Sequence, residues 1–196
     1  MTTALPLILA STSPYRQSLL ERLGLEFSVC SPAVDETPLP GEAPTALVHR
    51  LSEAKARAGA TRAGQGLVIG SDQVAVVGDE VLGKPGDAEH ACAQLTRLSG
   101  QRVDFLTGLC LFNSTDDRIQ LDVVPFSVIF RHLSPAQIED YVGRERPFNC
   151  AGSFKSEGLG IALFERMEGD DPSALIGLPL IRLVDMLETE GVTVLG

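Results

Sequence analysis

The sequence predicts an α/β fold in which a mixed, twisted sheet is flanked by helices. Short apolar runs suited to strands alternate along the chain with amphipathic helical segments, as is typical of α/β proteins. Two long strand-like segments, residues 103–113 and 119–130, are separated only by a polar turn, so part of the sheet must be antiparallel. The length of 196 residues fits one folding unit, and we expect a single domain over residues 1–196.

The N-terminal part begins with a predicted strand that runs directly into a helix. Residues 5–10 are an apolar run, and the Ser13-Pro14 pair after them offers a hydroxyl cap and a proline suited to the first helical turn. Apolar residues then recur at spacings of three and four up to Leu23, and Gly24 is placed to end the helix. The next elements are predicted to be a strand over 26–31, an ordered proline-containing loop over 32–44 and a helix over 45–63.

The apolar run that starts at residue 67 is interrupted by Asp72. We therefore expect strand-like segments over 67–70 and 74–77 on either side of a break, followed by a turn at 78–80. Asp87 is predicted to cap a helix that ends at Gly100. After the two long strands, the expected elements are a capping-box helix from Ser134 to Val142, a polar glycine-rich stretch over 150–160, a strand leading to Gly169 and an amphipathic helix over 176–190.

Charge and hydropathy exclude several classes of protein. Sixteen Lys and Arg against 26 Asp and Glu give a formal net charge of −10, which argues against stable nucleic-acid binding, so any phosphate site must be local. The apolar stretches are shorter than the roughly 18 residues that cross a bilayer, and the first residues do not resemble a secretion signal. We expect a cytoplasmic protein with no membrane partner. The four cysteines are widely spaced, which favours reduced buried thiols over a reactive or metal-binding thiol.

A first candidate site lies where the first strand meets the first helix. The segment from Ser11 to Arg16 combines hydroxyl groups, the free backbone N–H groups of a helix start and an arginine one turn into the helix. These groups are the ones that bind phosphate oxygens. The alternative is an ordinary capped helix with a solvated arginine, because such caps are common.

A second candidate site combines carboxylates and lysines from separate segments. Asp35 and Glu36 lie in the proline-containing loop, Lys55 on the long helix, Asp72 at the predicted strand break and Lys84 after a hairpin. Carboxylate oxygens and ammonium groups are the components needed for Mg²⁺-assisted attack on a phosphate. An acid inside an apolar run must be paired, liganded or protonated, and both a functional and a structural role for Asp72 stay open on this ground alone.

A third candidate is the polar loop over 150–158, which has glycines at both ends and Lys155 and Glu157 between them. It could close over a ligand, although an exposed turn is the alternative. The chain contains 13 Arg but only three Lys, Lys55, Lys84 and Lys155. Lysines retained in an arginine-rich chain indicate positions that need a compact ammonium group. The alternative is that these three positions carry lysine by chance.

Taken together and in order, these motifs resemble those of the Maf family of nucleotide pyrophosphatases. The resemblance covers nearly the whole chain. Four further segments, 71–73, 108–113, 130–134 and 150–158, look like the branch that acts on 7-methyl-GTP rather than the branches that favour dTTP and UTP. The motifs that match the family are Leu7 to Pro14, Val34 to Glu36, Leu51 to Ala56, Ile69 to Asp72, Gly83 to Pro85, Leu98 to Gly100, Thr107-Gly108, Ala151-Gly152 and Gly177 to Leu180.

The resemblance implies a fold with two lobes around a central cleft, and an enzyme that hydrolyses a nucleoside triphosphate to the monophosphate and pyrophosphate. It implies a divalent metal cofactor, Mg²⁺ or Mn²⁺, and a homodimer is expected because dimers are common among the relatives. By the family motifs, each role falls on residues of this chain as follows: Asp72 accepts a proton; Ser13, Arg16, Lys55 and Lys84 bind phosphate; Glu36 and Asp72 bind the metal; Tyr15, Gln73 and Glu157 select the base.

Two residues depart from the family pattern, and two other functions stay open. Gln17 stands where relatives often carry a second arginine, which puts one phosphate contact in doubt, and Ser173 stands where asparagine is frequent. The expected activity is hydrolysis of 7-methyl-GTP, which would clear modified nucleotides before they enter nucleic acid. The alternatives are the same reaction on dTTP or UTP, and a nucleotide-responsive regulator of cell division.

Overall fold

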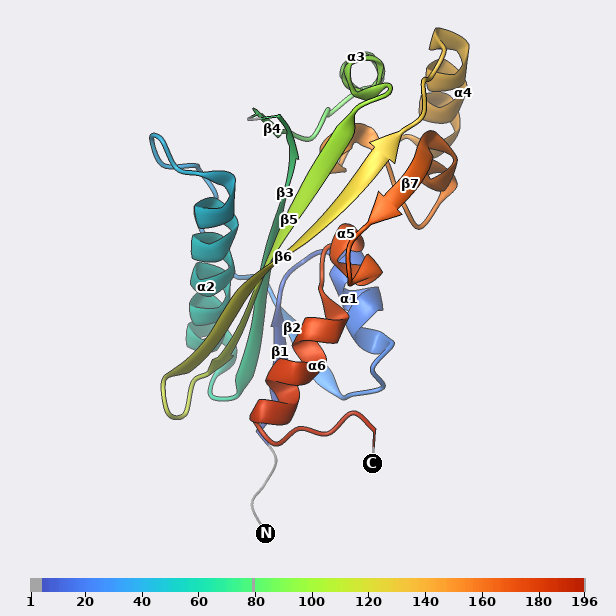
Figure 1. The fold of residues 1–196 in the computed structure, drawn as a ribbon. Helices are drawn as coiled ribbons and strands as arrows, with labels where there is room; N and C mark the ends of the chain where they lie inside the picture. Colours follow the sequence, from blue (N-terminus) through green and yellow to red (C-terminus); the bar gives the residue numbers. More distant parts are fainter. Residues whose placement is uncertain (1–4, 79, 196) are drawn as a thin grey trace.

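The computed structural model describes residues 5–78 and 80–195, which form a seven-stranded mixed sheet with helices on both faces (Figure 1). The strand order is β2-β1-β3-β5-β6-β7, and β4 pairs with β3. The strands are β1 Leu7–Ala10, β2 Phe27–Cys30, β3 Leu67–Val77, β4 Glu80–Leu82, β5 Arg102–Asn113, β6 Arg118–Phe130 and β7 Phe164–Glu168. The helices are α1 Pro14–Glu21, α2 Pro44–Ala63, α3 Ala88–Leu98, α4 Pro135–Glu145, α5 Pro172–Ile176 and α6 Leu180–Thr189, with short 3₁₀ turns η1 Ala151–Ser153 and η2 Leu159–Leu163.

The sheet is parallel at one edge and antiparallel over its larger part. β1 pairs in parallel with both β2 and β3, while β3, β5, β6 and β7 pair in antiparallel order. The long helix α2 connects β2 to β3, and a crossover of this kind is what parallel strands require. The predicted mixed α/β fold is therefore confirmed.

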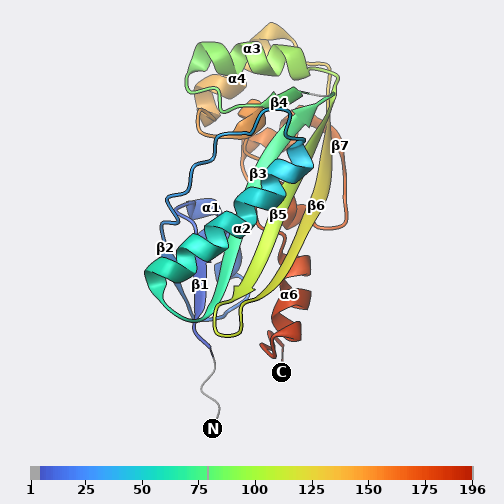
Figure 2. The same ribbon diagram turned by 90° about the vertical axis from the view of Figure 1, so that its left-hand side faces the viewer.

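Helices cover the two faces of the sheet unequally (Figure 2). The single helix α2 lies along one face, whereas α1, α5 and α6 pack on the other, and α3 and α4 lie at the far end of the long strands. Alternation along β1 fits this arrangement, because Leu7 and Leu9 join the core under α1 and α6, while Ile8 and Ala10 join the core under α2. No helix in the described part of the chain is both long and apolar enough to cross a membrane.

Two glycines bring α2 unusually close to the sheet. A Cβ atom added at Gly70 would lie 2.2 Å from the Ser52 carbonyl oxygen, and one added at Gly108 would lie 2.4 Å from the Val48 carbonyl oxygen. Gly70 and Gly108 lie on neighbouring strands, β3 and β5. The backbone of α2 therefore lies directly against these two strands, which fixes the distance between the helix and the sheet.

Gly108→Ala should lower the free energy of unfolding by about 1–3 kcal/mol, because α2 would have to move off the sheet. Thermal or urea unfolding of the variant measures this loss. Gly143→Ala is the matched control, since Gly143 is an exposed position in α4 with nothing within 4 Å of its added Cβ, and alanine is the better helix former. Equal stability of Gly108→Ala and the unmodified chain would show that the close approach is not tight.

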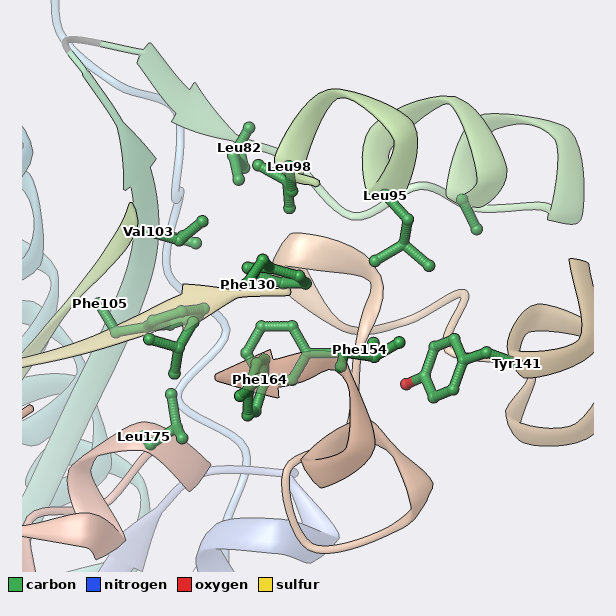
Figure 3. Close-up of a cluster of buried hydrophobic side chains, with 14 of the residues drawn as sticks. Leu82, Leu95, Leu98, Val103, Phe105, Phe130, Tyr141, Phe154, Phe164 and Leu175 are labelled. Carbon is green, nitrogen blue, oxygen red and sulfur yellow. The ribbon is translucent and has the colours of Figure 1, made fainter. Parts of the chain in front are cut away.

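The far end of the sheet holds a separate aromatic core (Figure 3). Phe154 packs edge-to-face against Phe105, Phe130 and Phe164, with ring centroids 4.7–5.8 Å apart. Phe154 belongs to the polar glycine-rich stretch, so this stretch is anchored in the core by its one phenylalanine. The alternative of an exposed turn is therefore wrong for residues 152–154, which are buried, and is correct for Glu157 and Gly158, which are exposed.

The helix predicted over 176–190 is α6, which begins at Leu180, and Ile176 is the last residue of the separate short helix α5. Gly177 between them has φ +124°, a conformation that favours glycine, and Pro179 follows at the N-cap of α6. The carboxylate of Asp171 ties the two helix starts together, because Oδ1 accepts from the Ser173 N–H and Oδ2 from the Ile181 N–H. Of the turn predicted at 78–80, Asp79 lies outside the described residues and Glu80 already belongs to β4.

Candidate functional site

The cleft lies beside the middle of β3. Within the described chain, β1 pairs with residues 67–69 of β3, and β4 pairs with residues 75–77. Between these two pairings, β3 borders a cleft of about 540 Å³ whose walls come from the start of α1, the loop before α2, β4 and the segment after α4. All nine predicted site residues line this cleft: Ser13, Tyr15, Arg16, Glu36, Lys55, Asp72, Gln73, Lys84 and Glu157.

A buried ion pair joins β3 to α2 at the floor of the cleft. Lys55 Nζ lies 2.6 Å from Asp72 Oδ1 and 2.6 Å from Glu36 Oε1. Lys55 and Asp72 are 5% and 8% exposed, whereas the side chain of Glu36 is 59% exposed. The hydrogen bond from Lys55 lowers the pKa of Glu36. This lysine therefore holds together one acid from the strand and one from the loop.

The predicted strand break at Asp72 is wrong. β3 runs without interruption from Leu67 to Val77, and Asp72 pairs in register with Gly108 of β5. Even-numbered residues of β3 face α2, so the Asp72 side chain points toward that helix and meets Lys55. The acid stays inside the strand because its charge is compensated there.

The carboxylates of Glu36 and Asp72 also fit a divalent cation. Both reach the same ammonium group, so two hard oxygen donors converge at one point of the cleft. Among the described residues there is no group of three or more His, Cys, Asp or Glu that could hold a metal. Two carboxylates suit a Mg²⁺ ion whose other ligands are water and substrate phosphate.

The N-terminus of α1 forms the neighbouring wall of the cleft. Ser13 caps the helix by accepting from the Arg16 N–H, as predicted, and Pro14 occupies the first turn. Arg16 Nε donates to the carbonyl oxygen of Gly177 at 2.8 Å, which orients the guanidinium. Burial lowers the pKa of Arg16, and the carboxylates of Asp72 and Glu36 oppose this shift. The arrangement places a cation and a helix N-terminus beside the acidic floor.

The side chains of Ser71 and Gln73 lie on the face of β3 opposite to that of Asp72. The Ser71 hydroxyl is within hydrogen-bonding distance of the carbonyl oxygens of Gly108 and Gly177, at 2.8 and 3.0 Å. Gln73 Nε2 donates to the Ala174 carbonyl oxygen at 2.7 Å. The amide nitrogen of Gln73 is thus committed to α5, and its Oε1 is the atom that can accept from a ligand.

Tyr15, Cys150 and Glu157 lie near one another in the lining of the cleft. Burial raises the pKa of Tyr15, with further contributions from Cys150 and Glu157. Burial also raises the pKa of the Cys150 thiol, which fits an unreactive cysteine. An aromatic ring and a carboxylate therefore border the same part of the cleft.

The three lysines have different surroundings. Lys55 is buried, and Lys84 is exposed at the rim of the cleft. Lys155 Nζ donates to the Glu145 carbonyl oxygen at 2.9 Å and lies 3.5 Å from Glu145 Oε1, so it fastens its loop to α4. Of the three lysines, Lys55 and Lys84 line the cleft, and Lys155 contacts α4 outside it. Whether these positions need a compact ammonium group stays a prediction.

The two departures from the family pattern have separate places. Gln17 is exposed on α1, where its amide nitrogen lies 3.4 Å from Glu21 Oε1. Ser173 is buried, and its hydroxyl donates to Asp171 and accepts from the Leu180 N–H at 2.7 Å. The serine therefore has a structural role at the junction of α5 and α6.

The sequence indicates no individual role for Ser71 or Gly177, although both lie in segments that match the family, because a serine and a glycine carry no charge pattern that would single them out. The Gly177 carbonyl oxygen accepts from Arg16 Nε, and the Ser71 hydroxyl lies 3.0 Å from the same oxygen. Gly177 followed by Pro179 was a readable signal for a helix boundary. The contact between Gly177 and Arg16 spans 161 positions, so only the fold could reveal it.

Comparison with known proteins gives relatives that match over nearly the whole of both chains. A family model described as Maf-like protein matches residues 6–190. The chain is 57% identical over 189 residues to a protein of Nitrosococcus oceani named 7-methyl-GTP pyrophosphatase, covering 96% of this chain and 95% of that one. It is also 57% identical over 190 residues to a protein of the same name from Pseudomonas putida, covering 97% and 99%.

A solved structure shares the fold. The structure of the Staphylococcus aureus Ham1 protein superposes with a TM-score of 0.53 and 16% identity, covering 94% of this chain and 99% of that one. At this identity the likeness supports the architecture alone. The family model and the relatives at 57% identity both span nearly the whole chain. The chain therefore belongs to the Maf family.

Proposed function

We propose that this protein is a pyrophosphatase that hydrolyses 7-methyl-GTP to 7-methyl-GMP and pyrophosphate. The observation that carries the proposal is the Glu36–Lys55–Asp72 cluster, which lies in the same cleft as the N-terminus of α1 and Arg16. The names of the two relatives at 57% identity support the choice of substrate. In the cell the reaction would remove a modified nucleotide before it enters nucleic acid.

Asp72 is the proposed general base. Its Oδ1 is held by Lys55, so the carboxylate has a fixed orientation and Oδ2 is the oxygen that accepts a proton from the attacking water. Lys55 holds the carboxylate in place before the reaction through its 2.6 Å contact with Oδ1. The water would attack the α-phosphorus, the bond from that phosphorus to the bridging oxygen would break, and pyrophosphate would leave.

Arg16, Lys84 and the start of α1 are the proposed phosphate-binding groups. Ser13 and the N–H groups of the first helical turn favour anions, and Arg16 places a second cation near the acidic cluster. Lys84 reaches the cleft from the segment after β4. Together these groups stabilise the negative charge that develops on pyrophosphate as it leaves.

A divalent cation, Mg²⁺ or Mn²⁺, is proposed to bind at Glu36 and Asp72. The chemistry that it supplies when bound is neutralisation of charge on the triphosphate oxygens. We also propose that the protein acts in the cytoplasm and as a homodimer, in line with the expectations from the sequence and the family.

Tyr15 and Glu157 are proposed to select the methylated base. The 7-methylguanine ring carries a positive charge that guanine lacks, and the Tyr15 ring and the Glu157 carboxylate offer it an aromatic face and an anion. Cation–π stacking contributes about 0.5–2 kcal/mol, so Tyr15→Leu should reduce the preference for 7-methyl-GTP over GTP by about twofold to thirtyfold. Glu157→Gln should reduce it in the same direction. The measurement is kcat/KM for both nucleotides in each variant.

The preference should fall mainly because kcat/KM for 7-methyl-GTP decreases, since the guanine ring of GTP carries no positive charge for these residues to bind. Gln17→Ala is a suitable control, because Gln17 is exposed on the same helix as Tyr15. An unchanged ratio in both Tyr15→Leu and Glu157→Gln would remove these residues from the base site.

Measuring pyrophosphate release over many turnovers distinguishes an enzyme from a nucleotide-responsive regulator. An enzyme releases many equivalents of pyrophosphate per protein chain when incubated with nucleotide and metal, whereas a nucleotide-responsive regulator binds nucleotide without continuous release. A preference for dTTP or UTP in the same assay would assign the reaction to another branch of the family.

A further inference from the structure

The loop that carries Glu36 is held by contacts that lie outside the cleft. The side chain of Glu36 is 59% exposed, so burial does not fix it, yet its Oε1 lies 2.6 Å from Lys55 Nζ. Asp35 Oδ1 accepts from the Thr37 N–H at 2.9 Å, which shapes the turn directly after Glu36. The remaining support for this loop comes from α2.

Arg50 of α2 binds the loop at two points. Its Nε and Nη2 atoms donate to the two carboxylate oxygens of Glu42, each at 2.7 Å. The Nη2 atom also donates to the Thr37 carbonyl oxygen at 3.2 Å. Glu42 Oε2 in turn accepts from the Leu39 N–H at 3.0 Å. The two ends of the turn over 37–42 are thus tied to one guanidinium.

The geometry and burial of the Arg50–Glu42 ion pair favour a rigid contact. The side chain of Glu42 is 7% exposed, and a paired two-point contact of this kind fixes geometry as well as charge. The hydrogen bonds from Arg50 lower the pKa of Glu42 to about 2, so the pair persists throughout the neutral range. Arg50 lies on the same helix as Lys55, five residues before it.

We propose that Arg50 is a positioning residue that, through Glu42 and Thr37, places the carboxylate of Glu36 over Lys55. Its role is to present Glu36 to the triphosphate and its cation in the correct position before substrate arrives. The loop is in this view a preformed wall of the cleft. This inference rests on the proposed function for its kinetic consequences but not for its structural ones.

Arg50→Gln should lower kcat/KM for 7-methyl-GTP by about tenfold. A shift of a catalytic group by up to about 1 Å lowers rates by this factor or more. Arg57→Gln is the matched control. Arg57 lies on the same helix and also contacts two carboxylates, Glu53 at 2.8 Å and Asp117 at 3.0 Å, but it is far from the loop over 37–42. Its replacement should leave kcat/KM within about twofold.

A double-mutant cycle separates positioning from general stabilisation. If Arg50 acts through Glu36, Arg50→Gln should change kcat/KM by less than about twofold in a Glu36→Gln background, since the group that it places has already been removed. Independent effects that multiply in the double variant would overturn the proposal.

A second readout does not depend on activity. The sequence contains no tryptophan, and Leu39 is 55% exposed, so Leu39→Trp gives a single tryptophan, excited selectively, within the loop while keeping the Leu39 backbone contact. Adding Arg50→Gln should lower the fluorescence anisotropy of this tryptophan and increase its quenching by acrylamide, and adding Arg57→Gln should not. Unchanged anisotropy with Arg50→Gln would overturn the proposal, even in a protein that hydrolyses no nucleotide.

Discussion

Asp72→Asn is expected to reduce turnover of 7-methyl-GTP at least about a hundredfold, the usual size of a general-base contribution. The substitution keeps the shape of the side chain and removes the group that accepts the proton. The fold should survive, because Lys55 keeps its ion pair with Glu36 at 2.6 Å after the charge on residue 72 is lost. The measurement is kcat for pyrophosphate release, with circular dichroism and the melting temperature recorded in parallel.

The control for this substitution is Asp104→Asn. Asp104 is also a paired acid within a strand, but its partners are Arg102 and Ser127 on β5 and β6, away from the cleft. Its replacement should leave kcat within about twofold. A folded Asp72→Asn variant with wild-type turnover would remove Asp72 from the role of base.

Lys55→Arg is expected to lower kcat/KM at least about thirtyfold, although the positive charge is retained. Lys55 is 5% exposed, and its compact ammonium group fits between two carboxylate oxygens that are each 2.6 Å away. A guanidinium is longer and planar, so it would push Glu36 and Asp72 apart. The measurement is kcat/KM in the variant, with its melting temperature as a check on folding.

Lys155→Arg is the matched control for this exchange. Lys155 contacts Glu145 outside the cleft, and an arginine can donate to the same oxygens. This variant should retain kcat/KM within about twofold. Equal activity of Lys55→Arg and the unmodified chain would show that the site needs a positive charge there and no particular geometry.

Local signals in the sequence identified most of the elements. The N-caps Ser13, Asp87 and Ser134 all accept the expected backbone hydrogen bond, and Ser134 forms the predicted capping box with Gln137. These features depend on residues three positions apart, so they can be read without knowledge of the fold. The same holds for the two long strands, whose apolar pattern and polar turn are local.

Features that depend on distant contacts could not be predicted. The sequence predicts a strand break at Asp72 because burying an acid in an apolar run is costly. The lysine that compensates the charge lies 17 positions away on another element. The family motifs identify the residues that line the cleft. They do not show that Gly177 orients Arg16 or that Arg50 contacts the loop that carries Glu36. A glycine carbonyl and an arginine among 13 carry no local signature.

We expect the cleft to hydrolyse a nucleoside triphosphate between its α- and β-phosphates and to prefer a cationic guanine base. The most direct measurement is the release of pyrophosphate by the purified, unmodified chain with Mg²⁺ from 7-methyl-GTP, GTP, dTTP and UTP, with the nucleotide products identified. We expect 7-methyl-GMP and pyrophosphate in equal amounts and the highest kcat/KM for 7-methyl-GTP. Release of single phosphate, no turnover, or a higher kcat/KM for dTTP or UTP would contradict the proposed function.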